Sequence, residues 1–128
     1  MVKNNKTFEY DLLFGELREQ RISEILQNKK IEVKTERGLW QETGNIAIEI
    51  AYRGKPSGLA TTEADYWLHI LERDGQEYCS LLLPVEVLKN RLRELYTYPA
   101  NGVRVVMGGD NQQSKLVLVP IAALFGVN

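Results

Sequence analysis

Two segments of this chain have a strictly alternating character, KIEVKTER at residues 30–37 and NIAIEIAY at residues 45–52. Alternation with a period of two is typical of a β-strand that has one buried face. A connection with glycine at both ends, residues 38–44, separates the two segments. We therefore predict that they form two antiparallel strands of a hairpin with a long connection.

The apolar faces of both predicted strands must reach the same core. This requirement places the following side chains on the core face: Ile31, Val33, Ile46, Ile48 and Ile50. The opposite face then carries the charged side chains Glu32, Lys34, Glu36 and Glu49. One register sets Glu32 opposite Glu49 and a shifted one sets Glu36 opposite Glu49, with Cβ atoms about 4.5–5.5 Å apart.

Carboxylates in such a pair repel each other unless a cation lies between them. Hard divalent ions such as Mg²⁺ prefer carboxylate and water oxygens, so Glu32, Glu49 and Glu36 are candidate metal ligands. Lys34 would lie beside the ion, where it could orient the attacking water or stabilise developing negative charge. An exposed strand face on which Glu and Lys alternate would produce the same pattern without any chemistry.

The other periodic segments complete an α/β (α+β) domain with a central mixed sheet and flanking helices. They are a helix at residues 10–27, strands at 66–71 and 78–83 joined by Asp74-Gly75, a helix that begins at Pro84, and strands at 103–107 and 115–119. Thr61 or Thr62 is expected to cap a short helix at residues 63–65.

The composition is that of an ordinary globular protein. The length of 128 residues predicts one domain, residues 1–128, and the formal net charge of -1 means that any contact with a polyanion must be local. The single cysteine excludes an intramolecular disulfide and a cysteine-based zinc site. Because no segment resembles a signal peptide or a membrane span, we expect a cytoplasmic protein without membrane contact.

Several other polar residues have a functional and a structural interpretation. The turn that contains Arg53, Lys55 and Ser57 offers cations and a hydroxyl for a phosphate backbone, or it is only a polar turn. Cations at residues 89, 91 and 93 could follow phosphates, or they form a solvated helix face. His69, the only histidine, lies in an apolar strand and is expected to be buried and hydrogen-bonded.

The order of Glu16 in the first helix, Glu32-Val33-Lys34 in a strand and Glu49 in the next resembles the PD-(D/E)xK nuclease superfamily. The run GNIAIEIAYRGKPSGLATTEADYW at residues 44–67 is similar to small phage-encoded members. The resemblance implies a restriction-endonuclease-like core and Mg²⁺-dependent hydrolysis of DNA, with Mn²⁺ as a substitute. It also implies a homodimer that acts on branched or structured DNA in the host cytoplasm, with Glu16 as a helix carboxylate near the metal.

The chain departs from the family pattern, because no Pro-Asp precedes the Glu-x-Lys element. Two mappings remain open. Either Glu32 and Lys34 form Glu-x-Lys with an acidic partner from Glu49 or Glu36, or Glu32 replaces the aspartate, Glu49 is the second carboxylate and the lysine has migrated to Lys34. The predicted function is a metal-dependent endonuclease. The alternatives are a catalytically inactive, nuclease-like module that binds nucleic acid or protein, and a small-molecule binder or hydrolase.

Overall fold

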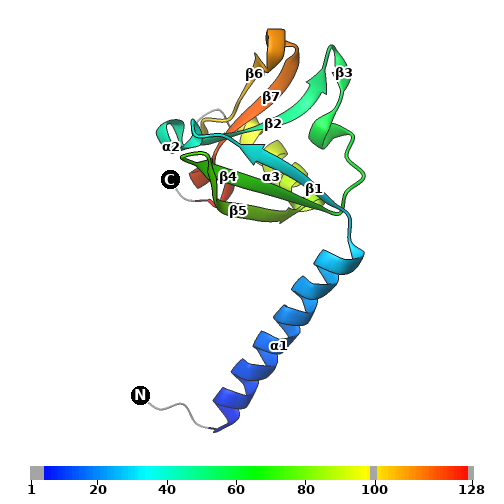
Figure 1. Cartoon of the computed structure of the whole chain (residues 1–128), viewed down its shortest axis with the longest axis vertical. Coiled ribbons are helices and arrows are strands. Elements are labelled where there is room, and N and C mark those ends of the chain that lie inside the picture. The colour runs from blue at the N-terminus through cyan, green and yellow to red at the C-terminus, as the bar shows by residue number, and fades with distance from the viewer. Residues whose placement is uncertain (1–4, 99–100, 127–128) are drawn as a thin grey trace. The chain divides into compact units, whose positions relative to one another are not determined.

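The chain divides into two units, Met1–Lys30 and Ile31–Asn128 (Figure 1). The computed structural model describes residues 5–98 and 101–126. The described residues of the first unit form one helix, α1 (Asn5–Asn28), which confirms the helix predicted at residues 10–27. In the described residues no helix is both long enough and apolar enough to cross a membrane.

The second unit has an α+β fold, as expected, and its strands form two sheets. The sheets have the strand orders β1-β4-β5 and β3-β2-β7-β6. The elements are β1 (Ile31–Glu36), α2 (Trp40–Thr43), β2 (Asn45–Tyr52), β3 (Lys55–Pro56), the 3₁₀ turn η1 (Gly58–Ala60), β4 (Tyr66–Arg73), β5 (Gln76–Pro84), α3 (Val85–Thr97), β6 (Arg104–Gly108), the 3₁₀ turn η3 (Asp110–Gln112), β7 (Ser114–Pro120) and α4 (Ile121–Leu124).

Local signals in the sequence predict most of these elements correctly. β4 and β5 form the expected hairpin, and Asp74 and Gly75 at its tip both have positive φ, 52° and 76°, as a two-residue primed turn requires. The hairpin of β6 and β7 and the start of α3 after Pro84 are also confirmed. The prediction of a short helix at residues 63–65 is wrong, because the helical turn lies earlier, at η1.

The predicted hairpin between β1 and β2 is wrong. β1 pairs with β4 in parallel, with Glu32 in register with Trp67 and Lys34 with His69. β2 pairs instead with β7 and, at its end, with β3. The two alternating segments therefore belong to different sheets.

This pairing also reverses the expected faces of β1. Residues in register across a ladder point to the same side, and Trp67 and His69 are 1% and 2% exposed. The charged residues of β1 therefore share the inner face of their sheet, while Val33 is 49% exposed, contrary to the prediction. An edge strand can present charges inward where hydrogen bonds satisfy them, which is the case for Glu36 below.

The predicted core face of β2 is confirmed. Ile46 and Ile48 are 1% and 0% exposed, and they belong to one cluster with Leu88 of α3 and Val119 of β7. Full burial of one such aliphatic side chain contributes roughly 1.5–3 kcal/mol. This core holds α3 against the four-stranded sheet and leaves Glu49 on the other side of β2.

Candidate functional site

The side chain of Glu36 connects the two sheets where backbone pairing between β1 and β2 was expected. Its Oε1 accepts a hydrogen bond from the backbone N of Ala47 in β2 at 2.8 Å. The same oxygen lies 2.9 Å from Nε2 of His69 in β4. One carboxylate oxygen therefore has donors from both sheets, which gives Glu36 a structural role.

The tautomer of His69 follows from its second partner. The indole Nε1 of Trp67 lies 3.1 Å from Nδ1 of His69, and an indole N–H can only donate. Nδ1 therefore accepts, and in the neutral ring Nε2 carries the proton that it donates to Glu36. The expectation of a buried, hydrogen-bonded histidine is confirmed.

We predict that Glu36→Ala lowers the free energy of unfolding by about 2–4 kcal/mol, because it leaves the N–H groups of Ala47 and His69 without an acceptor. Glu36→Gln retains an amide oxygen at this position and should cost far less. Chemical denaturation of both variants, with Glu42→Ala on exposed α2 as a control, measures the difference. Equal stability of Glu36→Ala and the control would show that the connection between the sheets is energetically neutral.

Glu32 and Glu49 belong to different sheets, yet both bind the short segment 57–62. Ser57 Oγ donates to Glu49 Oε2 at 3.1 Å, and Thr62 Oγ1 donates to Glu32 Oε1 at 3.3 Å. The second oxygen of Glu32, Oε2, lies 3.9 Å from Nζ of Lys34. The segment thus contacts Glu32 and Glu49, and Lys34 lies beside Glu32; these are three of the four residues predicted to be catalytic.

A close approach of backbones fixes the start of this segment against β2. Ser57 N donates to the carbonyl of Ile50 at 3.1 Å. At Gly58, φ is +55°, and a Cβ atom would lie only 2.2 Å from the carbonyl oxygen of Glu49. The ladder between β2 and β7 is also irregular here, between Glu49 and Ala51. Glycine is therefore the residue that lets the segment reach the Glu49 side chain.

The two carboxylates have a donor chemistry that fits Mg²⁺. The described residues contain no group of three or more His, Cys, Asp or Glu side chains arranged for a metal. Mg²⁺ commonly binds one or two carboxylates and keeps waters or substrate phosphates as its other ligands. The side chains of Glu32 and Lys34 are 36% and 44% exposed, so a phosphate can reach them.

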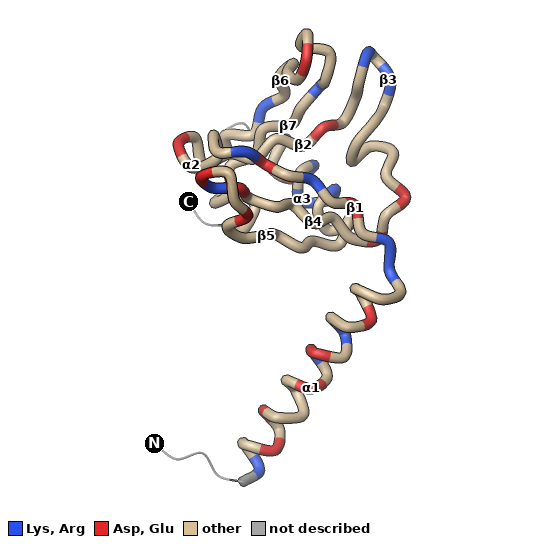
Figure 2. The backbone as a smooth tube through the Cα atoms, viewed as in Figure 1, with Lys and Arg blue, Asp and Glu red and all other residues tan. Residues whose placement is uncertain are grey.

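The predicted phosphate-binding residues do not act as one group. Arg53, in the turn after β2, and Lys55, the first residue of β3, are both exposed, and Figure 2 shows basic residues there. The guanidinium of Arg53 bonds to Gln113 Oε1 and lies over the ring of Tyr52, 5.3 Å from its centroid. Ser57 binds Glu49 instead. Contact of this turn with DNA remains a prediction.

Glu16 lies on α1 in the first unit, where it is exposed. The structure therefore does not assign it to the region of Glu32 and Glu49, which lies in the second unit. Its role as a helix carboxylate near a metal remains a prediction from the resemblance.

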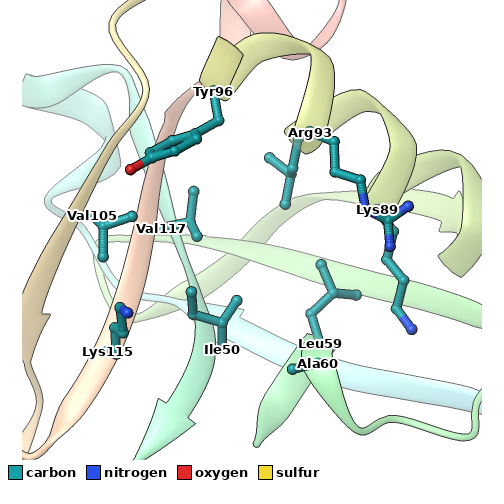
Figure 3. Close-up of a pocket in the computed structure, with 10 residues that line it drawn as sticks. Ile50, Leu59, Ala60, Lys89, Arg93, Tyr96, Val105, Lys115 and Val117 are labelled. Atoms are coloured by element: carbon teal, nitrogen blue, oxygen red, sulfur yellow. The ribbon is translucent and has the colours of Figure 1, made fainter. Parts of the chain in front are cut away.

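The described part of the second unit also contains a pocket that the sequence pattern does not predict. It lies between α3, η1 and the strands β2, β6 and β7 (Figure 3). Lys89 and Arg93 line it, whereas Arg91 between them donates to the carbonyls of Ala123 and Leu124. The run of basic residues in α3 was visible in the sequence. Only the packing shows that two of them line a pocket while Arg91 binds backbone carbonyls.

Comparison of the chain with protein-family models, with curated proteins and with solved structures finds no match.

Proposed function

We propose that this protein is a Mg²⁺-dependent endonuclease that hydrolyses phosphodiester bonds in DNA. One observation carries the proposal: the carboxylates of Glu32 and Glu49, from two different sheets, bind hydroxyls of the same segment, with Lys34 next to Glu32. Two carboxylates and a lysine are a donor set suited to phosphoryl chemistry.

Each residue has a distinct part in the proposed reaction. Glu32 and Glu49 would hold the ion, and Mg²⁺ would supply positive charge that favours attack of water on the phosphorus. Lys34 would donate to a phosphate oxygen and stabilise the charge that develops there. Ser57 and Thr62 would fix the orientation of the two carboxylates through the hydrogen bonds they donate.

The proposed partner is DNA, held through local cations because the net charge is -1. Arg53 and Lys55 are candidates for such contacts, since both side chains are exposed. From the resemblance to phage-encoded nucleases, we also propose that the protein is a homodimer that acts on branched DNA in the cytoplasm of a host.

A second candidate is a nuclease-like module that binds nucleic acid without cutting it. One observation favours it, namely that no cluster of three metal-binding side chains occurs within residues 5–98 and 101–126. In this case Glu32 and Lys34 form only an exposed ion pair, which contributes little to stability.

Metal titration separates the two candidates. The full chain is incubated with single-stranded, duplex, forked and four-way-junction DNA in the presence of Mg²⁺, Mn²⁺, Ca²⁺ or a chelator. The endonuclease proposal expects strand scission with Mg²⁺ or Mn²⁺ and none with the chelator. Binding to DNA without scission in any metal would support the binding module, and the absence of both would exclude both candidates.

A further inference from the structure

The pocket beside α3, which we call the α3 pocket, combines an apolar floor with a basic rim. Ile50, Leu59, Val105 and Val117 supply apolar surface from β2, η1, β6 and β7. Its volume of about 510 Å³ lies within the range of roughly 300–1,000 Å³ that is usual for small-molecule sites. Figure 3 shows the ring of Tyr96 near Val105 and Val117, at the end of the pocket away from Lys89.

All charged residues that line the α3 pocket are cations, namely Lys89, Arg93 and Lys115. The two lysines have no ion pair with any residue that the structure describes. The guanidinium of Arg93 bonds to a neutral group, Asn90 Oδ1, at 2.8 Å. Their positive charge is therefore not neutralised within the described chain, in a protein whose net charge is -1.

We propose that the α3 pocket binds one unstacked nucleotide of a DNA strand. A nucleotide has the two properties that the pocket selects, because its base is planar and largely apolar on its faces and its phosphate is anionic. The base would lie on the aliphatic floor and stack on Tyr96, a residue that is 61% exposed and thus available. Lys89, Arg93 and Lys115 would contact the phosphates on either side of it.

The inference rests on the proposed nuclease function and adds a substrate preference to it. Leu59 and Ala60 line the α3 pocket, while Ser57 and Thr62 of the same segment bind the two carboxylates. A nucleotide held in the pocket would therefore contact the same segment that binds Glu49, whose side chain lies on the other side of β2. Bases leave the stack most easily in single strands, forks and junctions, so these substrates should be preferred over intact duplex.

Binding of a fluorescein-labelled oligothymidylate to the full chain in chelator, measured by anisotropy, tests the pocket without any cleavage. Tyr96→Ala should weaken binding by about 5- to 150-fold, the range found for the loss of one base–aromatic stack. The double variant Lys89→Glu, Lys115→Glu should weaken binding by at least as much. Arg104→Glu is the matched control, an exposed cation of β6 outside the pocket, and should bind like the wild type.

The outcomes separate this inference from the proposed function. If Tyr96→Ala and the double variant bind like Arg104→Glu, the pocket assignment is overturned, whether or not the protein cuts DNA. If they lose binding while no metal supports scission, the pocket assignment holds and the nuclease proposal fails. Thymidine monophosphate that binds more tightly than the oligonucleotide would identify a free nucleotide as the ligand and overturn the assignment to DNA.

Discussion

Replacing Glu49 by glutamine is expected to lower the rate of DNA cleavage in saturating Mg²⁺ by roughly 100-fold or more. Glutamine has the shape of glutamate and retains an oxygen that can accept from Ser57 Oγ, which lies 3.1 Å from Glu49 Oε2. The substitution therefore removes the negative charge while keeping the side chain in position. Single-turnover kinetics on the best substrate of the metal titration measures the effect.

The same kinetics should show a large loss for Lys34→Ala, because a neutral side chain cannot stabilise the charge on the phosphate. Glu42→Gln supplies the control, since Glu42 is exposed on α2 and has no part in the proposed site. Isothermal titration with Mg²⁺ adds a reading that is independent of catalysis, and Glu49→Gln should weaken binding of the ion. Wild-type rates in Glu49→Gln would remove this residue from the mechanism.

Gly58→Ala is expected to lower the free energy of unfolding by roughly 2–5 kcal/mol, the sum of backbone strain and overpacking. The added Cβ would lie 2.2 Å from the carbonyl oxygen of Glu49, and the residue has a φ of +55° that alanine adopts only with strain. The segment must then move away from β2. Loss of the contact between Ser57 and Glu49 would follow, so DNA cleavage should fall together with stability.

Gly54→Ala separates the effect of backbone strain from the effect of overpacking. Gly54 also has positive φ, +78°, but a Cβ there meets nothing within 4 Å. It should therefore show only the strain, about 1–2 kcal/mol, and little change in cleavage. Urea denaturation of both variants gives the comparison. If Gly58→Ala is no less stable than Gly54→Ala, the segment tolerates displacement from β2, and the close approach does not constrain the position of Glu49.

The elements themselves were predictable because they depend on local interactions. The turn of Asp74 and Gly75 needs positive φ at two neighbouring residues, and Pro84 suits the start of a helix. The burial of Ile46 and Ile48 followed from alternation in one strand. None of these features depends on which distant segment lies next to them.

The partners of β1 were not predictable in this way. One face of β1 carries aliphatic side chains and the other carries side chains that form hydrogen bonds, so either face can be buried. Nearness in sequence favoured β2, but β4 offered a buried face with Trp67 and His69 to which Glu36 could bond. A hydrogen-bonded carboxylate on the inner face replaced the apolar contact that the pattern of β1 predicts.

The candidates Glu32, Lys34 and Glu49 follow from the sequence, because period-two alternation assigns them to strands and their chemistry suits a phosphodiester. What connects these residues depends on the fold. Their strands belong to different sheets, and the segment that starts with Ser57 links them because Gly58 allows it to lie directly on the backbone of β2. Such contacts depend on the packing of distant segments, which the pattern of one strand does not encode.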